Sequence, residues 1–363
     1  MTTPSHYETI NYMNETNLIP RQQYILNLIN KKETIGRLAI EEEIEKIYPA
    51  SKPTVARDLV LLLKNRLIKT SGKGKNTVYF AYTNSPLLRE FNIDQYFQLD
   101  PDQRSDVKKT FNFDIYRHLT NIFSDKEKEN IQSINKDFYK ESQKITPDIY
   151  QKELERFIIE FAWKSSKIEG NTYSLLDTET LIKQKVEAQG HSKEEAVMIL
   201  NHKQAFDLIL NHKNDFKTIS IARITELHNC IVHGMGITTG LRTHSVGITG
   251  TSYLPLDNNW QIQEALEKLI KALEKVTFPL EKALIAGIML SYIQPFADGN
   301  KRTSRMLANA ILIAQNFYPL SYRSVNEDEY KKALILFYEQ NSIYQLKNIF
   351  IDQYKFALQT YFR

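Results

Sequence analysis

The sequence is short of the features that mark secreted and membrane proteins. Cys230 is the only cysteine among 363 residues, so an intramolecular disulfide is excluded and a reducing compartment fits. No apolar run reaches the roughly 18 residues that a membrane-spanning helix needs. Residues 1–17 are polar and lack the apolar centre of a signal peptide. These absences predict a soluble, cytoplasmic protein with no membrane partner.

Positive charge is concentrated near the start of the chain. Residues 1–84 contain 12 Lys and Arg against 8 Asp and Glu, whereas the two classes cancel in the remainder. The excess lies in residues 51–75, which hold seven basic residues and one acid, Asp58. A local basic excess of this kind favours an anionic partner for the N-terminal part of the protein.

After a loose tail over 1–17, hydrophobic periodicity in residues 18–84 predicts three short helices followed by a hairpin. This order is that of a winged helix-turn-helix, in which the third helix enters the major groove and the hairpin contacts phosphates. We therefore predict that this domain binds duplex DNA. The residues expected to contact DNA are Lys52, Thr54, Arg57, Lys73 and Lys75. A winged helix used only for protein contacts, or as a spacer, is the alternative.

A second feature is the stretch from Gln294 to Arg305, which reads Q-P-F-A-D-G-N-K-R-T-S-R between two apolar runs that predict buried helices. Lys301, Arg302 and Arg305 fall on the first turns of the second helix, where the helix dipole disfavours cations. Cations beside free backbone N–H groups at a helix start are typical of a phosphate site. Asp298 is placed to hold magnesium between its carboxylate and phosphate oxygens.

This stretch resembles the signature of the Fic family, H-x-F-x-[D/E]-G-N-G/K-R-x-x-R. The matching residues are Phe296, Asp298, Gly299, Asn300, Lys301, Arg302 and Arg305. Gln294 departs from the signature, because the family has its catalytic histidine at this position. Family members transfer AMP from ATP to a hydroxyl of a protein, so the resemblance implies ATP and Mg2+ as cofactors. It implies nucleotide contacts from Gly299, Asn300, Lys301, Arg302 and Arg305, and a metal contact from Asp298.

A motif at the end of a predicted long helix, Tyr150 to Ile168, also resembles a Fic feature. Ser165, Glu169 and Gly170 match the inhibitory motif of the family, [S/T]-x-x-x-E-[G/N]. The resemblance implies that Glu169 pairs with Arg305 and blocks productive placement of the γ-phosphate.

The segment 240–255 alternates apolar and small residues around a Gly-Thr turn, which predicts a β-hairpin. It resembles the Fic flap, G-x-R-x-x-x-V-x-I-x-G-T-x-Y-x-P, which aligns the target chain by strand addition. The docking residues would be Thr249, Gly250, Thr251 and Tyr253. A plain structural hairpin is the alternative.

We therefore predict a mainly α protein with a winged helix over 18–84, a helical connector over 85–147 and a Fic-type helical bundle over 148–363. Its bundle would begin with the inhibitory helix and carry a small β-hairpin flap. The histidines between 191 and 233 match no metal-ligand spacing. The sequence names no target protein and leaves a homo-oligomer open.

Three hypotheses for function remain. The first is an autoinhibited protein adenylyltransferase whose activity is reduced or lost, because the amide of Gln294 has no basic nitrogen to take a proton. The second is a nucleotide-sensing pseudo-enzyme that controls the DNA-binding winged helix. The third is transfer from a donor other than ATP. The intact inhibitory motif favours the first hypothesis, and Gln294 favours the second.

Overall fold

The computed structural model describes residues 18–32, 34–65, 67–81, 85–104 and 106–361, so the tail expected over 1–17 lies outside the described residues. The chain divides after Arg89 into two units, Met1–Arg89 and Glu90–Arg363, and each is described by itself. None of the helices in the described part of the chain is long and apolar enough to cross a bilayer.

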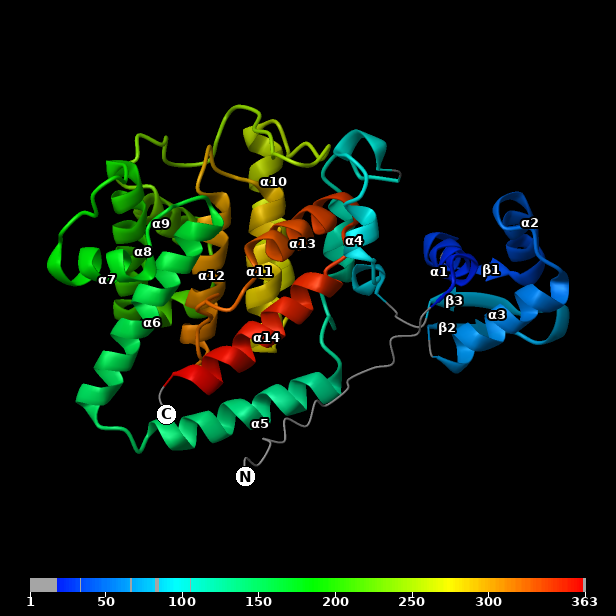
Figure 1. Cartoon of the computed structure of the whole chain (residues 1–363), viewed down its shortest axis with the longest axis horizontal. Coiled ribbons are helices and arrows are strands. Elements are labelled where there is room, and N and C mark those ends of the chain that lie inside the picture. Colours follow the sequence, from blue (N-terminus) through cyan, green and yellow to red (C-terminus); the bar gives the residue numbers. More distant parts are fainter. Residues whose placement is uncertain (1–17, 33, 66, 82–84, 105, 362–363) are drawn as a thin grey trace, which may run out of the picture. The chain divides into compact units, whose positions relative to one another are not determined.

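Unit 1 combines three helices with a small antiparallel sheet (Figure 1). Its elements are α1 (Pro20–Lys32), β1 (Ile35–Gly36), α2 (Arg37–Ile47), α3 (Lys52–Lys64), β2 (Ile68–Ser71) and β3 (Val78–Ala81). β3 pairs with both other strands, so the sheet order is β1-β3-β2. Apolar side chains from all three helices form one core that includes Ile25, Ile29, Ile40, Ile44, Leu59 and Leu62.

A buried carboxylate ties α1 to α3. Asp58 is 4% exposed and accepts bonds from Arg21 Nε at 2.7 Å and from Gln22 Nε2 at 2.8 Å. A carboxylate removed from water is costly without such donors, so these contacts fix how α3 lies on α1. The neighbouring side chain of Arg57 stays exposed.

Unit 2 is a bundle of helices (Figure 1). Its helices are α4 (Ile93–Tyr96), α5 (Asp125–Ser142), α6 (Pro147–Ile168), α7 (Leu175–Gln184), α8 (Lys193–Asn211), α9 (Ile221–Ile231), α10 (Asn259–Glu274), α11 (Pro279–Ile293), α12 (Asn300–Ala314), α13 (Glu327–Gln340) and α14 (Tyr344–Thr360). α12 packs against α6, α8, α9 and α11. Gly287 lets α11 approach α12 closely, since a Cβ there would lie 3.2 Å from Ser304 O.

Residues 90–124, which belong to the segment expected as a connector, are built into unit 2. Phe111 stacks on Tyr292 of α11 with ring centroids 4.6 Å apart. Ile122 N donates to Glu281 Oε1 at 2.7 Å, which places a second contact on α11. The segment therefore contributes to the core of the bundle.

The segment 240–255 does not form the predicted β-hairpin. Among the described residues its one bridge pair joins Leu254 to Thr110, from outside the segment. The guanidinium of Arg242 donates to the carbonyl of His244, within the segment, and to that of Leu256, just after it. The segment is an irregular loop between α9 and α10 that is held by these side-chain bonds and carries no named strand.

We expect Asp58→Ala to destabilise unit 1 by about 2 kcal/mol, because Arg21 and Gln22 lose a charged acceptor in a buried position. Native-state hydrogen exchange with mass spectrometry would show this as faster exchange in α1 and α3 of the full chain. Arg57→Ala, on the same helix but exposed, is the matched control and should leave exchange unchanged. Equal protection in both variants would contradict a structural role for Asp58.

Candidate functional site

The turn between α11 and α12 is held by its own side chains. Asn300 closes it, because its amide accepts from Phe296 N at 2.9 Å and donates to Phe296 O at 2.8 Å. Gly299 has a φ of +79°, and a Cβ there would lie 2.8 Å from Val232 Cγ1, so the position requires glycine. The turn therefore presents the first N–H groups of α12, which have no acceptor within the helix.

His228 of α9 braces this turn. Its ring stacks on Phe296 with centroids 3.7 Å apart and an interplanar angle of 8°. Its Nε2 donates to Asp298 O at 2.9 Å. Burial lowers the pKa of His228, which favours the neutral ring in this position. In the sequence, His228 is one of several histidines whose spacing fits no metal site, and no local pattern indicates its bracing role.

A cavity of about 190 Å³ opens at the N-terminus of α12. It is lined by the end of α6, the loop after α9 and the α11–α12 turn. The predicted site residues that it brings together are Glu169, Thr249, Gln294, Asp298, Gly299, Asn300, Lys301 and Arg302. The predicted residues outside its lining are Ser165, Gly170, Gly250, Thr251, Tyr253 and Arg305.

The carboxylate of Asp298 and the guanidinium of Arg302 form an ion pair at the cavity. Arg302 Nη2 donates to Asp298 Oδ2 at 3.1 Å, while Asp298 Oδ1 accepts from Gly299 N at 2.6 Å. The side chain of Arg302 is 4% exposed and that of Asp298 is 67% exposed. Burial lowers the pKa of Arg302, although a guanidinium stays protonated at neutral pH. The pair thus has a fixed cation and an accessible carboxylate.

Arg305 lies behind Glu169 and is 1% exposed. Its Nη1 donates to Glu169 Oε1, its Nε to Ser165 Oγ and its Nη2 to Ser165 O, each at 2.9 Å. The contact between Glu169 and Arg305 that the resemblance implies is therefore present. Burial alone would raise the pKa of Glu169, but the positive charges of Arg305 and Lys301 outweigh it and hold this pKa below 4.5.

His202 of α8 supports Ser165 from the opposite side. We assign the ring proton to Nδ1, which donates to Met198 O at 2.8 Å, so that Nε2 accepts from Ser165 Oγ at 2.9 Å. The hydroxyl therefore keeps its lone pairs for Arg305. Burial lowers the pKa of His202 to about 3, which keeps the ring neutral. No sequence pattern distinguished this histidine from any other on a buried helix face.

Gln294 ends α11 in a left-handed conformation with φ +51°. Its Nε2 donates to Ser291 O at 2.7 Å, and its backbone oxygen accepts from Arg242 Nε at 2.6 Å. Arg242 is 3% exposed and thereby joins the loop after α9 to the Gln294 position. In the sequence, Arg242 is one residue of the stretch that resembles the Fic flap, and no local pattern indicates this role.

Of the expected docking residues, only Thr249 faces the cavity. Thr251 Oγ1 donates to Glu339 Oε1 at 2.6 Å, and Tyr253 OH donates to Tyr292 O at 2.8 Å. These side chains anchor the loop to α13 and α11. Within the described residues, no hydrogen bond involves the backbone of residues 246–249, and these residues line the cavity.

The residues expected to contact DNA lie on α3 and on the connection between β2 and β3. Lys52, Arg57 and Lys73 are exposed, whereas Thr54 is half-buried with its Oγ1 2.9 Å from Ser51 Oγ. The side chain of Lys75 lies outside the described residues. The part of the chain that the structure describes contains no group of three or more His, Cys, Asp or Glu able to hold a metal ion.

Comparisons with known proteins point to one family. Residues 218–312 match the sequence profile of the Fic/DOC family. The chain is 29% identical over 182 residues to a protein adenylyltransferase Fic of Nematostella vectensis, covering 47% of this chain and 41% of that protein. It is 26% identical over 180 residues to protein adenylyltransferase fic-1 of Caenorhabditis elegans, covering 48% and 35%. The chain thus spans less than half the length of these curated relatives.

Solved structures share the fold. Residues 134–508 of Fic-1 from C. elegans superpose with a TM-score of 0.54 at 20% identity, covering 68% of this chain and 71% of that chain. A Fic family protein from Desulfovibrio desulfuricans G20 has the same TM-score at 19% identity, covering 65% and 74%. The helical bundle of unit 2 is therefore of the Fic type.

The ion pair between Glu169 and Arg305 predicts a specific pH dependence of stability. Because the folded pKa of Glu169 lies below its ordinary 4.5, its contribution is fully present above pH 4.5 and is lost as pH falls through the lower folded value. The difference in free energy of unfolding between the protein and Glu169→Gln should therefore be constant near neutral pH and shrink in acid. Chemical denaturation from about pH 7 to about pH 3 measures it.

Glu155→Gln, on the exposed side of α6, is the control for loss of one negative charge and should give a smaller difference. A difference for Glu169→Gln that grows as the pH falls would contradict the sign of this prediction.

Proposed function

Since the chain carries a Fic/DOC domain over residues 218–312, we propose that unit 2 is a protein adenylyltransferase scaffold that binds ATP with Mg2+. The reaction would transfer AMP to a Ser, Thr or Tyr hydroxyl of another protein. The hydroxyl oxygen attacks the α-phosphorus, the bond to the β-phosphate breaks, pyrophosphate leaves, and the hydroxyl proton passes to an acceptor. The observation that carries this proposal is the cavity at the start of α12, lined by Lys301 and Arg302.

The phosphates of ATP would be held by the open end of α12. The N–H groups at this end and the side chains of Lys301 and Arg302 converge on the cavity, and such donors bind phosphate well. Positioning and charge stabilisation supply most of the rate in reactions at phosphorus. The similarity to relatives named protein adenylyltransferase supports the choice of AMP as the group transferred.

Asp298 would hold Mg2+ through its carboxylate. Magnesium is usually bound by one or two carboxylates together with substrate phosphates and water, so a single accessible carboxylate beside a phosphate site fits this ion. The 67% exposure of the Asp298 side chain supports the assignment. The ion would supply charge neutralisation at the phosphates.

Glu169 would inhibit the site by occupying Arg305. In the proposed active state, Nη1 of Arg305 binds the γ-phosphate. In this structure the same nitrogen donates to Glu169 Oε1 at 2.9 Å. The two bonds from Arg305 to Ser165 do not involve Glu169, so they can persist when the carboxylate leaves. Release would thus exchange one anionic acceptor for another on the same guanidinium.

Gln294 is expected to reduce transfer or abolish it. Its Nε2 donates to Ser291 O, which leaves Oε1 to accept a hydrogen bond from a target hydroxyl and orient it. An amide oxygen does not take the proton away, and a general base typically contributes about 10²- to 10⁴-fold. The target chain would approach along residues 246–249, whose unpaired backbone can receive an extended segment.

Four proteins test this proposal by transfer of label from α-labelled ATP to protein: the chain, Glu169→Gly, Gln294→His and the double variant. Glu169→Gly removes the positioning defect and Gln294→His removes the chemical defect, so the double variant should exceed the sum of the singles. Adding Arg302→Ala to the double variant is the control and should abolish the gain. Strong transfer by Glu169→Gly alone would contradict the proposal that Gln294 reduces or abolishes AMP transfer.

A second candidate function is a nucleotide-sensing module that controls DNA binding by unit 1. Two observations favour it: Gln294 at the position of the family's base, and the order of elements in unit 1. The order of helix, strand, two helices and a final antiparallel pair of strands supports a winged helix. The exposed cations of α3, Lys52 and Arg57, would lie along DNA, with Lys73 on the phosphate backbone.

We expect the full chain to bind duplex DNA with an affinity that falls steeply with salt, because phosphate contacts release counterions. Arg57→Ala and Lys73→Ala should each weaken binding and lower the salt slope by about one unit. Lys46→Ala removes an equal charge from α2 and is the matched control. Fluorescence anisotropy over a salt series measures both quantities, and no salt-sensitive binding would make unit 1 a protein-contact module.

A further inference from the structure

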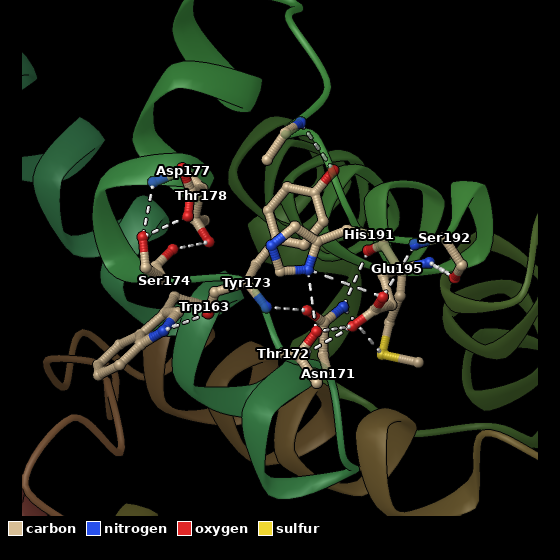
Figure 2. Close-up of polar contacts among 12 residues, drawn as sticks. Trp163, Asn171, Thr172, Tyr173, Ser174, Asp177, Thr178, His191, Ser192 and Glu195 are labelled. Carbon is tan, nitrogen blue, oxygen red and sulfur yellow. Dashed lines mark hydrogen bonds and ion pairs between the residues drawn. The ribbon is translucent and has the colours of Figure 1, made fainter.

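The loop that follows Glu169 is fastened to the first turn of α8 (Figure 2). Glu195 Oε1 accepts from Thr172 N and from Thr172 Oγ1, both at 2.7 Å. Its other oxygen accepts from Ser192 N at 3.0 Å, which completes a capping box at the start of α8. The same carboxylate therefore caps α8 and binds the loop.

Asn171 and His191 reinforce this connection (Figure 2). Asn171 Nδ2 donates to Glu195 O at 2.9 Å. The Thr172 hydroxyl gives its only proton to Glu195, so His191 Nδ1 must donate to that hydroxyl, at 2.9 Å. The ring of Tyr173 packs on His191 with centroids 4.4 Å apart. Charge, amide and ring contacts thus hold residues 171–173 to the first turn of α8 and to His191, just before its cap.

This loop fixes the backbone of Glu169 from its C-terminal side. Glu169 is the C-cap residue of α6, and Gly170 follows with a φ of +98°. Asn171 N donates to Ser166 O at 3.1 Å, so the loop turns back directly over the helix end. Helix ends fray unless their last groups are held, so the direction of the Glu169 side chain depends on what holds the loop.

We propose that Glu195 is a positioning residue that keeps Glu169 on Arg305 by holding the loop 170–173. This inference rests on the proposed function, in which Glu169 blocks the γ-phosphate position. Loss of the bonds from Thr172 to Glu195 frees the loop and lets Glu169 leave Arg305. Helix α8 then sets the inhibited state from two points, with His202 behind Ser165 and Glu195 behind Thr172.

A role in capping α8 alone is the competing explanation for Glu195. It would change the stability of the protein, but it would leave the choice between ATP and ADP unaltered. The positioning role changes that choice, because only ATP has the γ-phosphate that a freed Arg305 would meet. The ratio of the ADP and ATP dissociation constants therefore separates the two roles.

Isothermal titration of the full chain with Mg2+-ATP and Mg2+-ADP measures this ratio. The proteins are the parent chain, Glu195→Ala, Glu169→Gly and the double variant. Glu195→Ala should raise the ratio about fivefold, the lower end of typical coupling between sites. The double variant should match Glu169→Gly, because both changes remove the same obstacle. Glu194→Gln, an exposed residue on the same turn, is the matched control and should leave the ratio unchanged.

Fluorescence gives an independent view of the loop. Trp163 Nε1 donates to Tyr173 O at 3.1 Å, and the only other tryptophan, Trp260, is 83% exposed. In a Trp260→Phe background, Trp163 emission should change in Glu195→Ala and stay unchanged in Glu194→Gln.

Thr172→Val keeps the capping box of α8 and should shift the ratio of dissociation constants in the same direction as Glu195→Ala. The proposal can therefore be tested even if Glu195→Ala folds poorly.

The outcomes are distinct. A raised ratio in Glu169→Gly, with parent-like ratios in Glu195→Ala and Thr172→Val, would overturn the positioning role and leave the proposed function standing. Parent-like ratios in all variants, Glu169→Gly included, would show that Glu169 does not block the γ-phosphate, and both proposals would fall.

Discussion

The arrangement of unit 2 around its cavity depends on the burial of one charge, the guanidinium of Arg305. A buried cation is costly unless its donors are met by acceptors, and here α6 supplies them through Ser165 and Glu169. Helix α12, which carries Arg305, and helix α6, which ends beside Glu169, are thereby bound together. Removing the Glu169 side chain would leave Nη1 of Arg305 in a buried position without that acceptor. A phosphate oxygen could then take the place of the carboxylate. The proposed inhibition by Glu169 and the proposed binding of a nucleotide would thus be two ways of supplying an acceptor to the same guanidinium.

Sequence periodicity and local motifs were enough to place α6, α11 and α12, because these helices are long and their apolar residues recur at helical spacing. The turn from Gln294 to Asn300 could be read for the same reason, since Gly299 and Asn300 act within a few residues of each other. The pairing of Glu169 with Arg305 came from the resemblance to Fic proteins rather than from any local pattern. A contact across 136 residues leaves no periodic trace in the sequence.

What escaped the sequence was set by long-range contacts. His202 and Arg242 gain their roles from backbone and hydroxyl groups that the fold brings to them, so their residue types alone carried no signal. The hairpin predicted over 240–255 was wrong, because bonds from the Arg242 guanidinium to carbonyls outside the segment, those of Leu256 and Gln294, hold this stretch in place of strand pairing. Residues 90–124 belong to the segment predicted as a helical connector, yet Phe111 is buried against Tyr292, a residue far along the chain.

The contacts that residues 90–124 make with the rest of unit 2 determine where the protein can be divided. Glu339 is completely buried and meets Arg104 at 3.1 Å and Tyr96 OH at 2.6 Å, both from before the long helix α6. A fragment cut at the start of α6 would strand this carboxylate without its cation and uncover the ring of Tyr292. A junction for replacing unit 1 by another domain, in the laboratory or by gene fusion, should therefore lie upstream of Glu90. Residues 90–124 belong to the bundle, because they contribute to its core.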